Sequence, residues 1–183
     1  MTITDRTLFL YTDIDAEQVA KITEAILAIN NYDNLQEQKL VNYQRTPIYL
    51  FINSNGGVVY DGLALVDIMT NSKTPIITIA IGKCMSMALI VFLSGHERYV
   101  SKNATFMFHS VAGGATGKLT YIQQELGEAR RLNKICCDII TKKTKIKEKT
   151  LIDFVDKQSE WYFDAQTAIK YEVANALYKG NMI

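Results

Sequence analysis

Apolar residues along this chain fall into short runs, which are separated by polar turns and by stripes of helical spacing. Residues 47–52 and 76–81 are near-continuous apolar runs, typical of strands that are buried on both faces of a parallel sheet. Residues 7–11, 98–100 and 105–108 are expected to form shorter strands. The alternation of strand, turn and helix predicts an α/β fold with much parallel pairing.

Helices are predicted where apolar residues recur at three- or four-residue steps. Residues 15–29 carry such a stripe through Val19, Ile22 and Ile26, and residues 61–69 carry a second one. Both segments are therefore expected to be helical.

Residues 76–93 are apolar over a length that raises the question of a membrane span. Gly82, Lys83 and Ser86 lie near the centre of this stretch, where a helix that faces lipid would tolerate them poorly. We therefore interpret the stretch as a buried strand, a turn and a buried helix over residues 85–93.

A longer helical stripe follows Gly117 and continues to about Lys143 without a proline. A helix of that length would be roughly 40 Å long, which exceeds the diameter of a small domain. It is predicted to project and to bury its stripe against another copy of the chain, which makes the protein an oligomer. The alternative is a helix that breaks near Gly127 and packs within its own domain. The stripe consists of Leu119, Ile122, Leu126, Ala129, Leu132, Cys136, Ile139 and Ile140.

The composition fits one soluble domain. The chain has 183 residues, of which 48% are hydrophobic and 21% charged, and its net charge of +1 indicates neither a nucleic-acid nor a membrane partner. Three cysteines without a secretory signal before them predict reduced thiols in the cytoplasm. Cys136 and Cys137 are adjacent and lack the spacing of a zinc site, so no metal is expected.

The candidate chemistry begins with a serine and two histidines. Ser86 lies where a buried strand meets a buried helix, so its hydroxyl is expected near the unpaired N–H groups at the start of that helix. Those N–H groups can hold an oxyanion beside a reactive serine. The alternative is that the serine simply caps the helix. His109 ends an apolar strand and precedes a glycine-rich segment, whereas His96 lies in a polar turn and is expected to be a solvated loop residue.

A third signal is the pair of glycines in residues 53–57 (NSNGG), directly after a buried strand. Adjacent glycines let the backbone approach a ligand closely and direct an N–H group at it. A plain turn is the alternative, and the phosphate-binding glycine motifs are absent from the sequence.

Four segments together, in this order, resemble the Clp protease proteolytic subunit (ClpP) from Thr7 to about Asn175. They are residues 47–59 (PIYLFINSNGGVV), 82–88 (GKCMSMA), 105–114 (TFMFHSVAGG) and 161–175 (WYFDAQTAIKYEVAN). The resemblance implies one ClpP/crotonase-like α/β domain over residues 1–183, made of repeated strand-turn-helix units with a projecting long handle helix. Its head would comprise about residues 1–112 and 145–183, and its handle about residues 113–144.

The resemblance further implies a serine endopeptidase that needs no cofactor. Its nucleophile falls on Ser86 and its general base on His109, while the backbone N–H groups of Gly57 and Met87 form the oxyanion hole. The glycine-rich strand of residues 112–117 would pair with an extended peptide substrate. By this resemblance, Ala112, Gly113 and Gly114 would be the substrate-binding residues.

The acid that orients the histidine is less settled, because the aspartate of the family falls on Glu160 here. Glutamate can take this role, but its additional methylene group requires a changed backbone. Asp156 and Asp164 lie nearby in the sequence and are the alternatives, and an incomplete triad is the third interpretation.

The resemblance implies further copies of the chain as partners, in heptameric rings stacked in pairs. A Clp-family ATPase and a ClpP paralogue are the further candidates. The hydrophobic ATPase-docking pocket of the family falls on Tyr49, Phe51, Ile79 and Tyr99, although one of its aromatic positions falls on Asn71. Only six residues precede the first predicted strand, which is short for the pore-lining segment of the family.

Three functions remain open from the sequence. The first is an active, self-compartmentalised peptidase, which the presence of both Ser86 and His109 favours. The second is a non-catalytic subunit of a mixed ring. The third is a crotonase-type acyl-CoA enzyme, which shares the fold but does not need this serine and this histidine.

Overall fold

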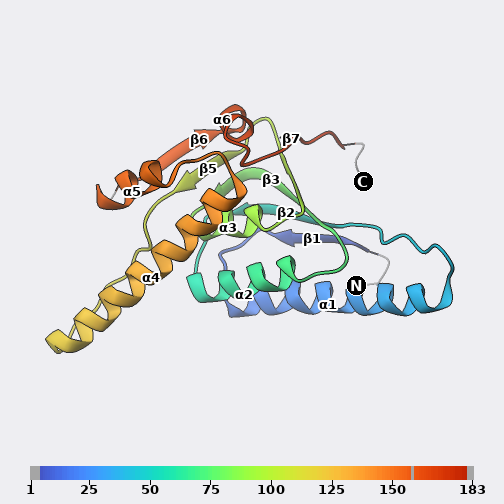
Figure 1. The fold of residues 1–183 in the computed structure, drawn as a ribbon, viewed down its shortest axis with the longest axis horizontal. Helices are drawn as coiled ribbons and strands as arrows, with labels where there is room; N and C mark the ends of the chain where they lie inside the picture. The colour runs from blue at the N-terminus through green and yellow to red at the C-terminus, as the bar shows by residue number, and fades with distance from the viewer. Residues whose placement is uncertain (1–4, 158, 181–183) are drawn as a thin grey trace.

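The structure is a computed structural model that describes residues 5–157 and 159–180 (Figure 1). Its centre is a parallel sheet in the order β1-β2-β3-β4-β7. These strands are β1 (Thr7–Leu10), β2 (Ile48–Ser54), β3 (Ile76–Met85), β4 (Glu97–Val100) and β7 (Ala176–Leu177). The predicted α/β fold with mainly parallel pairing is therefore confirmed.

The long strand β3 changes its pairing partner along its length, and this change brings the residues that follow β3 and β5 together. Residues 77–80 pair with β4, whereas residues 83–85 pair with β5 (Thr105–Phe108). Gly82 lies between the two stretches with a φ of 61°, a left-handed conformation that favours glycine. The far edge of β5 is covered in antiparallel register by β6 (Trp161–Asp164).

Helices cover one face of the parallel sheet. Figure 1 shows α1 (Ala16–Lys39) and α2 (Val59–Thr70) side by side below the strands, and α3 (Met87–Leu93) lies between α2 and the strands. Every residue of α3 is buried, so this short helix forms the centre of the hydrophobic core. Two further helices, α5 (Glu148–Asp156) and α6 (Ala165–Lys170), flank β6 in the chain.

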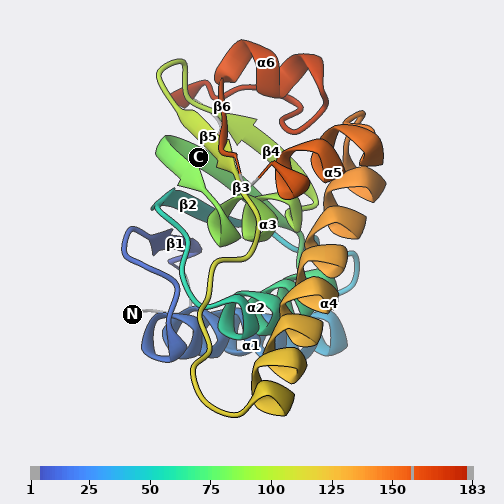
Figure 2. The same ribbon diagram turned by 90° about the vertical axis from the view of Figure 1, so that its left-hand side faces the viewer.

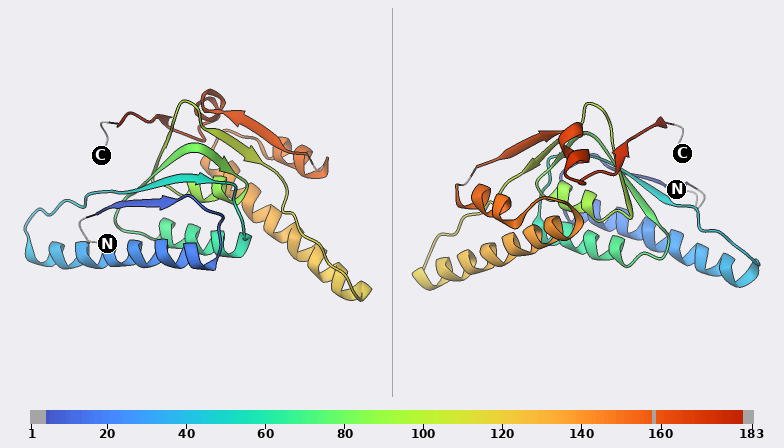
Figure 3. Two further views of the ribbon diagram at one scale, coloured as in Figure 1. Left: turned by 180° about the vertical axis from the view of Figure 1, so that it is seen from behind. Right: turned by 45° about the horizontal axis from the view of Figure 1, so that its top comes forward.

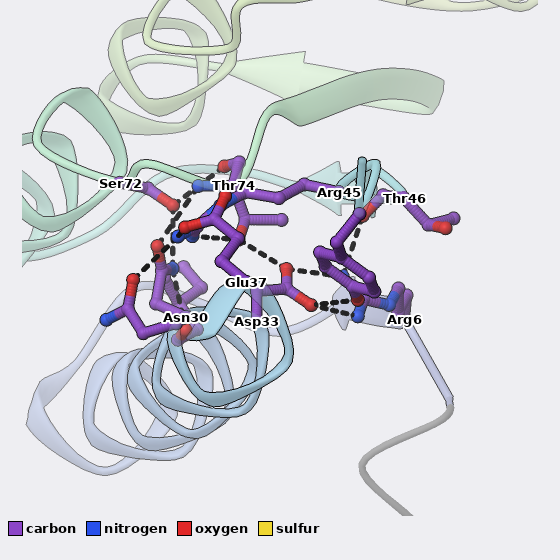
Figure 4. A network of polar contacts seen from close by, with 11 residues as sticks. Arg6, Asn30, Asp33, Glu37, Arg45, Thr46, Ser72 and Thr74 are labelled. Carbon is purple, nitrogen blue, oxygen red and sulfur yellow. Dashed lines mark hydrogen bonds and ion pairs between the residues drawn. The ribbon is translucent and has the colours of Figure 1, made fainter. Parts of the chain in front are cut away.

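Helix α1 extends ten residues beyond the predicted end at residue 29, because a buried polar network replaces the apolar stripe. The side chain of Asp33 is fully buried and accepts hydrogen bonds from Arg6, Tyr43 and Thr74 (Figure 4). Burial raises the pKa of Asp33, but these donors outweigh it and hold that pKa at about 2. The network ties α1 to the starts of β1 and β3.

Helix α4 (Leu119–Lys143) is continuous through Gly127, so the alternative of a broken helix is wrong. Its C-terminal half packs on the core through buried Leu132, Cys136 and Ile140. Its N-terminal half projects from the domain in every view (Figures 1 and 3), and Leu126 there is 49% exposed. The C-terminal half of the predicted stripe is therefore buried within the chain, whereas its N-terminal half is exposed.

Residues 112–117, predicted as a strand, form no strand in the structure. After β5 ends at Phe108 the chain leaves the sheet and runs beside α4 towards its N-terminus (Figure 2). Because β5 is already flanked by β3 and β6, this segment has no sheet edge of its own chain to join. Across the part of the chain that the structure describes, no helix is both long and apolar enough to span a membrane.

Candidate active site

Ser86 occupies the sharp turn between β3 and α3. Its backbone has a φ of 51° and a ψ of −124°, a conformation that a residue with a side chain adopts at an energetic cost. The turn is held by the N–H of Ser86, which donates to the carbonyl of Met107 on β5 at 2.8 Å. The β3–β5 pairing therefore fixes where the serine lies.

The hydroxyl of Ser86 contacts the imidazole of His109. Ser86 Oγ lies 2.7 Å from His109 Nε2, and both residues are half-buried. Ser86 makes no side-chain hydrogen bond to the start of α3, so its interpretation as a simple helix cap is wrong. Because β3 and β5 are parallel neighbours, the residues that follow them meet at one edge of the sheet.

The glycine pair after β2 packs directly on this turn. A Cβ atom on Gly56, whose φ is 103°, would lie 2.8 Å from the carbonyl oxygen of Met85 and 2.9 Å from Ser86 Cβ. Gly57 has a φ of 148°, and its own Cβ would collide with the backbone of Ile14. Both positions therefore require glycine, and the backbone of the pair approaches the serine as the sequence predicted.

A pocket of about 280 Å³ opens at this point, and Gly57, Met87, Ser86 and His109 all line it. Met87 is the first residue of α3, where a backbone N–H has no acceptor within the helix. The remaining wall is mainly apolar and includes Val59, Ile90, Met107 and Cys136. Such a pocket can hold an apolar side chain beside an electrophilic carbonyl.

His96 lies away from this site. Its side chain is exposed, and its Nδ1 accepts a hydrogen bond from the N–H of Ile76 at the start of β3, whereas Ser86 follows the end of that strand. Cys84 is fully buried behind the turn, and burial raises the pKa of its thiol. Neither residue is available for chemistry in the pocket.

The predicted acid Glu160 stands opposite His109 by register but has another partner. The last pair of the β5–β6 ladder is Phe108 with Trp161, so the next pair across it is His109 with Glu160. The carboxylate of Glu160 is exposed and accepts a hydrogen bond from the hydroxyl of Tyr162 at 2.7 Å. The structure brings Glu160 to the right end of the sheet without a hydrogen bond to the histidine.

The two alternative acids have different surroundings. Asp164 caps α6 by accepting from the N–H of Thr167 at 2.8 Å, which lowers the pKa of Asp164. It pairs with Thr105, at the opposite end of β5 from His109. Asp156 is the exposed last residue of α5. Of the three carboxylates, Glu160 has the register that suits the histidine.

Asn133 is a polar residue of the pocket that the sequence pattern did not single out. Asn133 of α4 lines the pocket and accepts a hydrogen bond from the N–H of Val111 at 2.8 Å. The only sequence signal was a polar residue beside the apolar stripe, next to Leu132. Such residues are common on helix surfaces, so this signal was weak.

The four predicted docking residues share one face of the sheet. Phe51, Ile79 and Tyr99 are direct neighbours across β2, β3 and β4, and Tyr49 lies two residues before Phe51 on the same face. Phe9 stacks on Phe51 with 5.8 Å between ring centroids, so an aromatic residue that sequence reasoning missed extends this face.

A serine that is hydrogen-bonded to a histidine, with helical and glycine N–H groups at the same pocket, is the arrangement of a serine hydrolase on an α/β fold. Comparison with known proteins narrows this class. The family model described as Clp protease matches residues 1–180. The chain belongs to the Clp protease family and is a serine endopeptidase of that family.

Individual relatives agree with this assignment. The chain is 27% identical over 169 residues to the ATP-dependent Clp protease proteolytic subunit of Deinococcus radiodurans, a match that covers 91% of this chain and 77% of that protein. Among solved structures, a ClpP1 mutant from Listeria monocytogenes superposes with a TM-score of 0.81 at 21% identity. That match covers 97% of this chain and 94% of the other, and it supports the same fold.

Proposed function

We propose that this chain is the peptidase subunit of a self-compartmentalised protease, with Ser86 as nucleophile and His109 as general base. The 2.7 Å contact between Ser86 Oγ and His109 Nε2 is the observation that carries the proposal. A serine hydroxyl is too weak an acid to attack a peptide carbonyl unaided, so an adjacent base must accept its proton as the bond forms.

The reaction follows from the groups at the pocket. Ser86 Oγ adds to the carbonyl carbon while its proton passes to His109 Nε2, and the N–H groups of Gly57 and Met87 stabilise the oxyanion. The protonated imidazole then donates that proton to the leaving amine as the C–N bond breaks. Water, deprotonated by His109, hydrolyses the acyl-enzyme and restores Ser86. We assign Glu160 as the acid that orients His109.

The substrate is proposed to be an unfolded polypeptide or peptide in extended form. Ala112, Gly113 and Gly114 begin three residues after the base His109 and are exposed, which suits main-chain pairing with a substrate strand. The apolar wall of the pocket suits an apolar side chain beside the scissile bond.

The assembly is proposed to be two heptameric rings that are joined by the handle, about residues 113–144, while the head comprises about residues 1–112 and 145–183. The exposed apolar side chains of Leu119, Ile122 and Leu126 on the projecting half of α4 support this role. A Clp-type ATPase would dock on the face of Tyr49, Phe51, Ile79 and Tyr99, and a ClpP paralogue could share the ring. Three buried free cysteines suit a reducing cytoplasm.

Hydrolysis assays test the proposal. The oligomer should cleave a short fluorogenic peptide without ATP, and Ser86→Ala and His109→Ala should each abolish cleavage while the oligomer persists. Cleavage of a folded protein should require an ATPase partner. An assembled wild type that cleaves neither peptides nor an unfolded protein would instead be the non-catalytic ring subunit. Family membership already excludes the crotonase-type interpretation.

A further inference from the structure

The segment between His109 and α4 is fastened to that helix by one side chain. The N–H of Val111, two residues after His109, donates to Asn133 Oδ1 at 2.8 Å. Figure 2 shows the segment running beside α4 after it leaves β5. Val111 directly precedes the three residues to which we assign substrate pairing.

Beyond Val111 the segment is loosely held in the described chain. A Cβ atom on Gly113 or on Gly114 would meet no atom within 4 Å, and Ala112 is exposed. A backbone with so few neighbours samples many conformations, and ordering it on substrate binding costs free energy. A fixed point at Val111 reduces this cost.

Asn133 is itself rigidly placed. It lies in the part of α4 where Leu132 and Cys136 are buried against the core, and it lines the pocket next to Ser86 and His109. Its amide oxygen is the group that can accept from a backbone N–H, and a hydrocarbon side chain of similar size cannot. The hydrogen bond therefore restrains the backbone of the segment at Val111 relative to α4.

We propose that Asn133 is a positioning residue that holds residues 112–114 ready to pair with an extended peptide. This inference rests on the proposed function. Asn133 acts through Val111 and takes no part in proton transfer. Its loss should weaken peptide binding while the reaction between Ser86 and a small electrophile, which needs no strand pairing, continues.

The test compares Asn133→Leu, which removes the acceptor, with Asn133→Asp, which retains it. Lys134→Gln is the matched control, because Lys134 is the next residue, is exposed, and pairs with Asp138 at 3.0 Å. On a fluorogenic peptide, Asn133→Leu should raise KM about 3- to 10-fold, the effect of one hydrogen bond, and lower kcat less. Asn133→Asp and Lys134→Gln should retain the wild-type KM, and all variants should react with a fluorophosphonate within about twofold of the wild-type rate.

A binding measurement separates this inference from the proposed function. The Kd of a fluorescently labelled peptide is measured by anisotropy for the Ser86→Ala protein and for the same protein that also carries Asn133→Leu. The second protein should bind the peptide more weakly, by the factor by which Asn133→Leu raises KM. An unchanged Kd, or an Asn133→Asp variant as poor as Asn133→Leu, would overturn the role of Asn133. A loss of fluorophosphonate labelling in Asn133→Leu at unchanged oligomer mass would also overturn it, because the damage would then include the serine. A wild type that does not label at all would instead count against the proposed function.

Discussion

Glu160 and Tyr162 lie two residues apart on the same face of β6, and the tyrosine hydroxyl donates to the glutamate carboxylate at 2.7 Å. The same face carries His109 across the β5–β6 ladder, one residue beyond its last pair. If Glu160 orients His109 as proposed, the hydroxyl of Tyr162 and the imidazole of His109 compete for one carboxylate.

This competition predicts opposite effects for two substitutions. If Glu160 orients His109 during the reaction, Glu160→Gln should lower kcat/KM for a short peptide. The loss should be about 10- to 1,000-fold, smaller than the roughly 10⁴-fold loss for the buried aspartate of a chymotrypsin-type triad because Glu160 is exposed. Tyr162→Phe removes the competing donor and should leave kcat/KM unchanged or raise it.

Two aspartates provide the controls for this assignment. Asp164→Asn should retain activity, because asparagine also caps a helix N-terminus. Asp156→Asn should be neutral as well, since its side chain ends α5. A loss of activity confined to Asp156→Asn would transfer the orienting role from Glu160 to Asp156.

The packing of Gly56 on the nucleophile predicts a sharp effect of one methyl group. Gly56→Ala should reduce peptide cleavage and fluorophosphonate labelling by about 100-fold or more, because the displaced turn also moves an oxyanion donor. Gly127→Ala adds the same methyl group where no atom lies within 4 Å and should leave labelling unchanged. Circular dichroism shows whether each variant is folded. A folded Gly56→Ala protein with normal labelling would contradict the geometry of the turn.

The buried network of Asp33 predicts a loss of stability in acid. The pKa of Asp33 is lowered to about 2 in the folded chain and is about 3.9 in an unfolded one, so its stabilising effect is complete above pH 4 and disappears as the pH falls towards 2. Asp33→Asn should remove this pH dependence. It should also lower the free energy of unfolding near pH 7 by about 3–5 kcal/mol, because Arg6, whose side chain is only 11% exposed, loses its charge partner.

Glu37→Gln is the control for that measurement. Glu37 pairs with Arg45 at 2.7 Å, but its side chain is 45% exposed, and such pairs contribute less than about 1 kcal/mol. Urea denaturation at fixed protein concentration between pH 3 and pH 7 provides the comparison. Equal losses in Asp33→Asn and Glu37→Gln would contradict the special place of the buried carboxylate.

The unpartnered half of α4 predicts how the assembly separates. Leu126→Asp places a charge in the exposed apolar stripe and should split the proposed double ring, so that light scattering reports about half of the wild-type mass. Gln123→Glu adds a charge on the same projecting stretch outside the stripe and should leave the mass unchanged. A wild type with the mass of one 20.7 kDa chain would contradict the proposed assembly.

The sequence predicted the elements whose residues carry a strong pattern. The apolar runs became β2 and β3, and the stripe after Gly117 became α4. The second half of α1 could not be predicted, because its inward face is polar at Asp33 and depends on Arg6 and Thr74 from distant parts of the chain. The short elements α5 and α6 have too few residues to show a reliable period.

The candidate site divides in the same way. The strand-turn-helix context and a family resemblance pointed to Ser86 and His109, but their contact depends on the change of partner along β3, which no local pattern encodes. The hydrogen bond of Asn133 to Val111 joins a helix to a loop of no regular structure. Long-range contacts of single polar side chains leave no periodic trace in a sequence.

The central claim is that Ser86, activated by His109, is the nucleophile. The most direct measurement treats the assembled protein with a fluorophosphonate, digests it and locates the adduct by mass spectrometry. We expect a single adduct on Ser86, none in Ser86→Ala, and labelling at least about 100-fold slower in His109→Ala. An adduct on another residue, or rapid labelling that persists in Ser86→Ala, would contradict the claim.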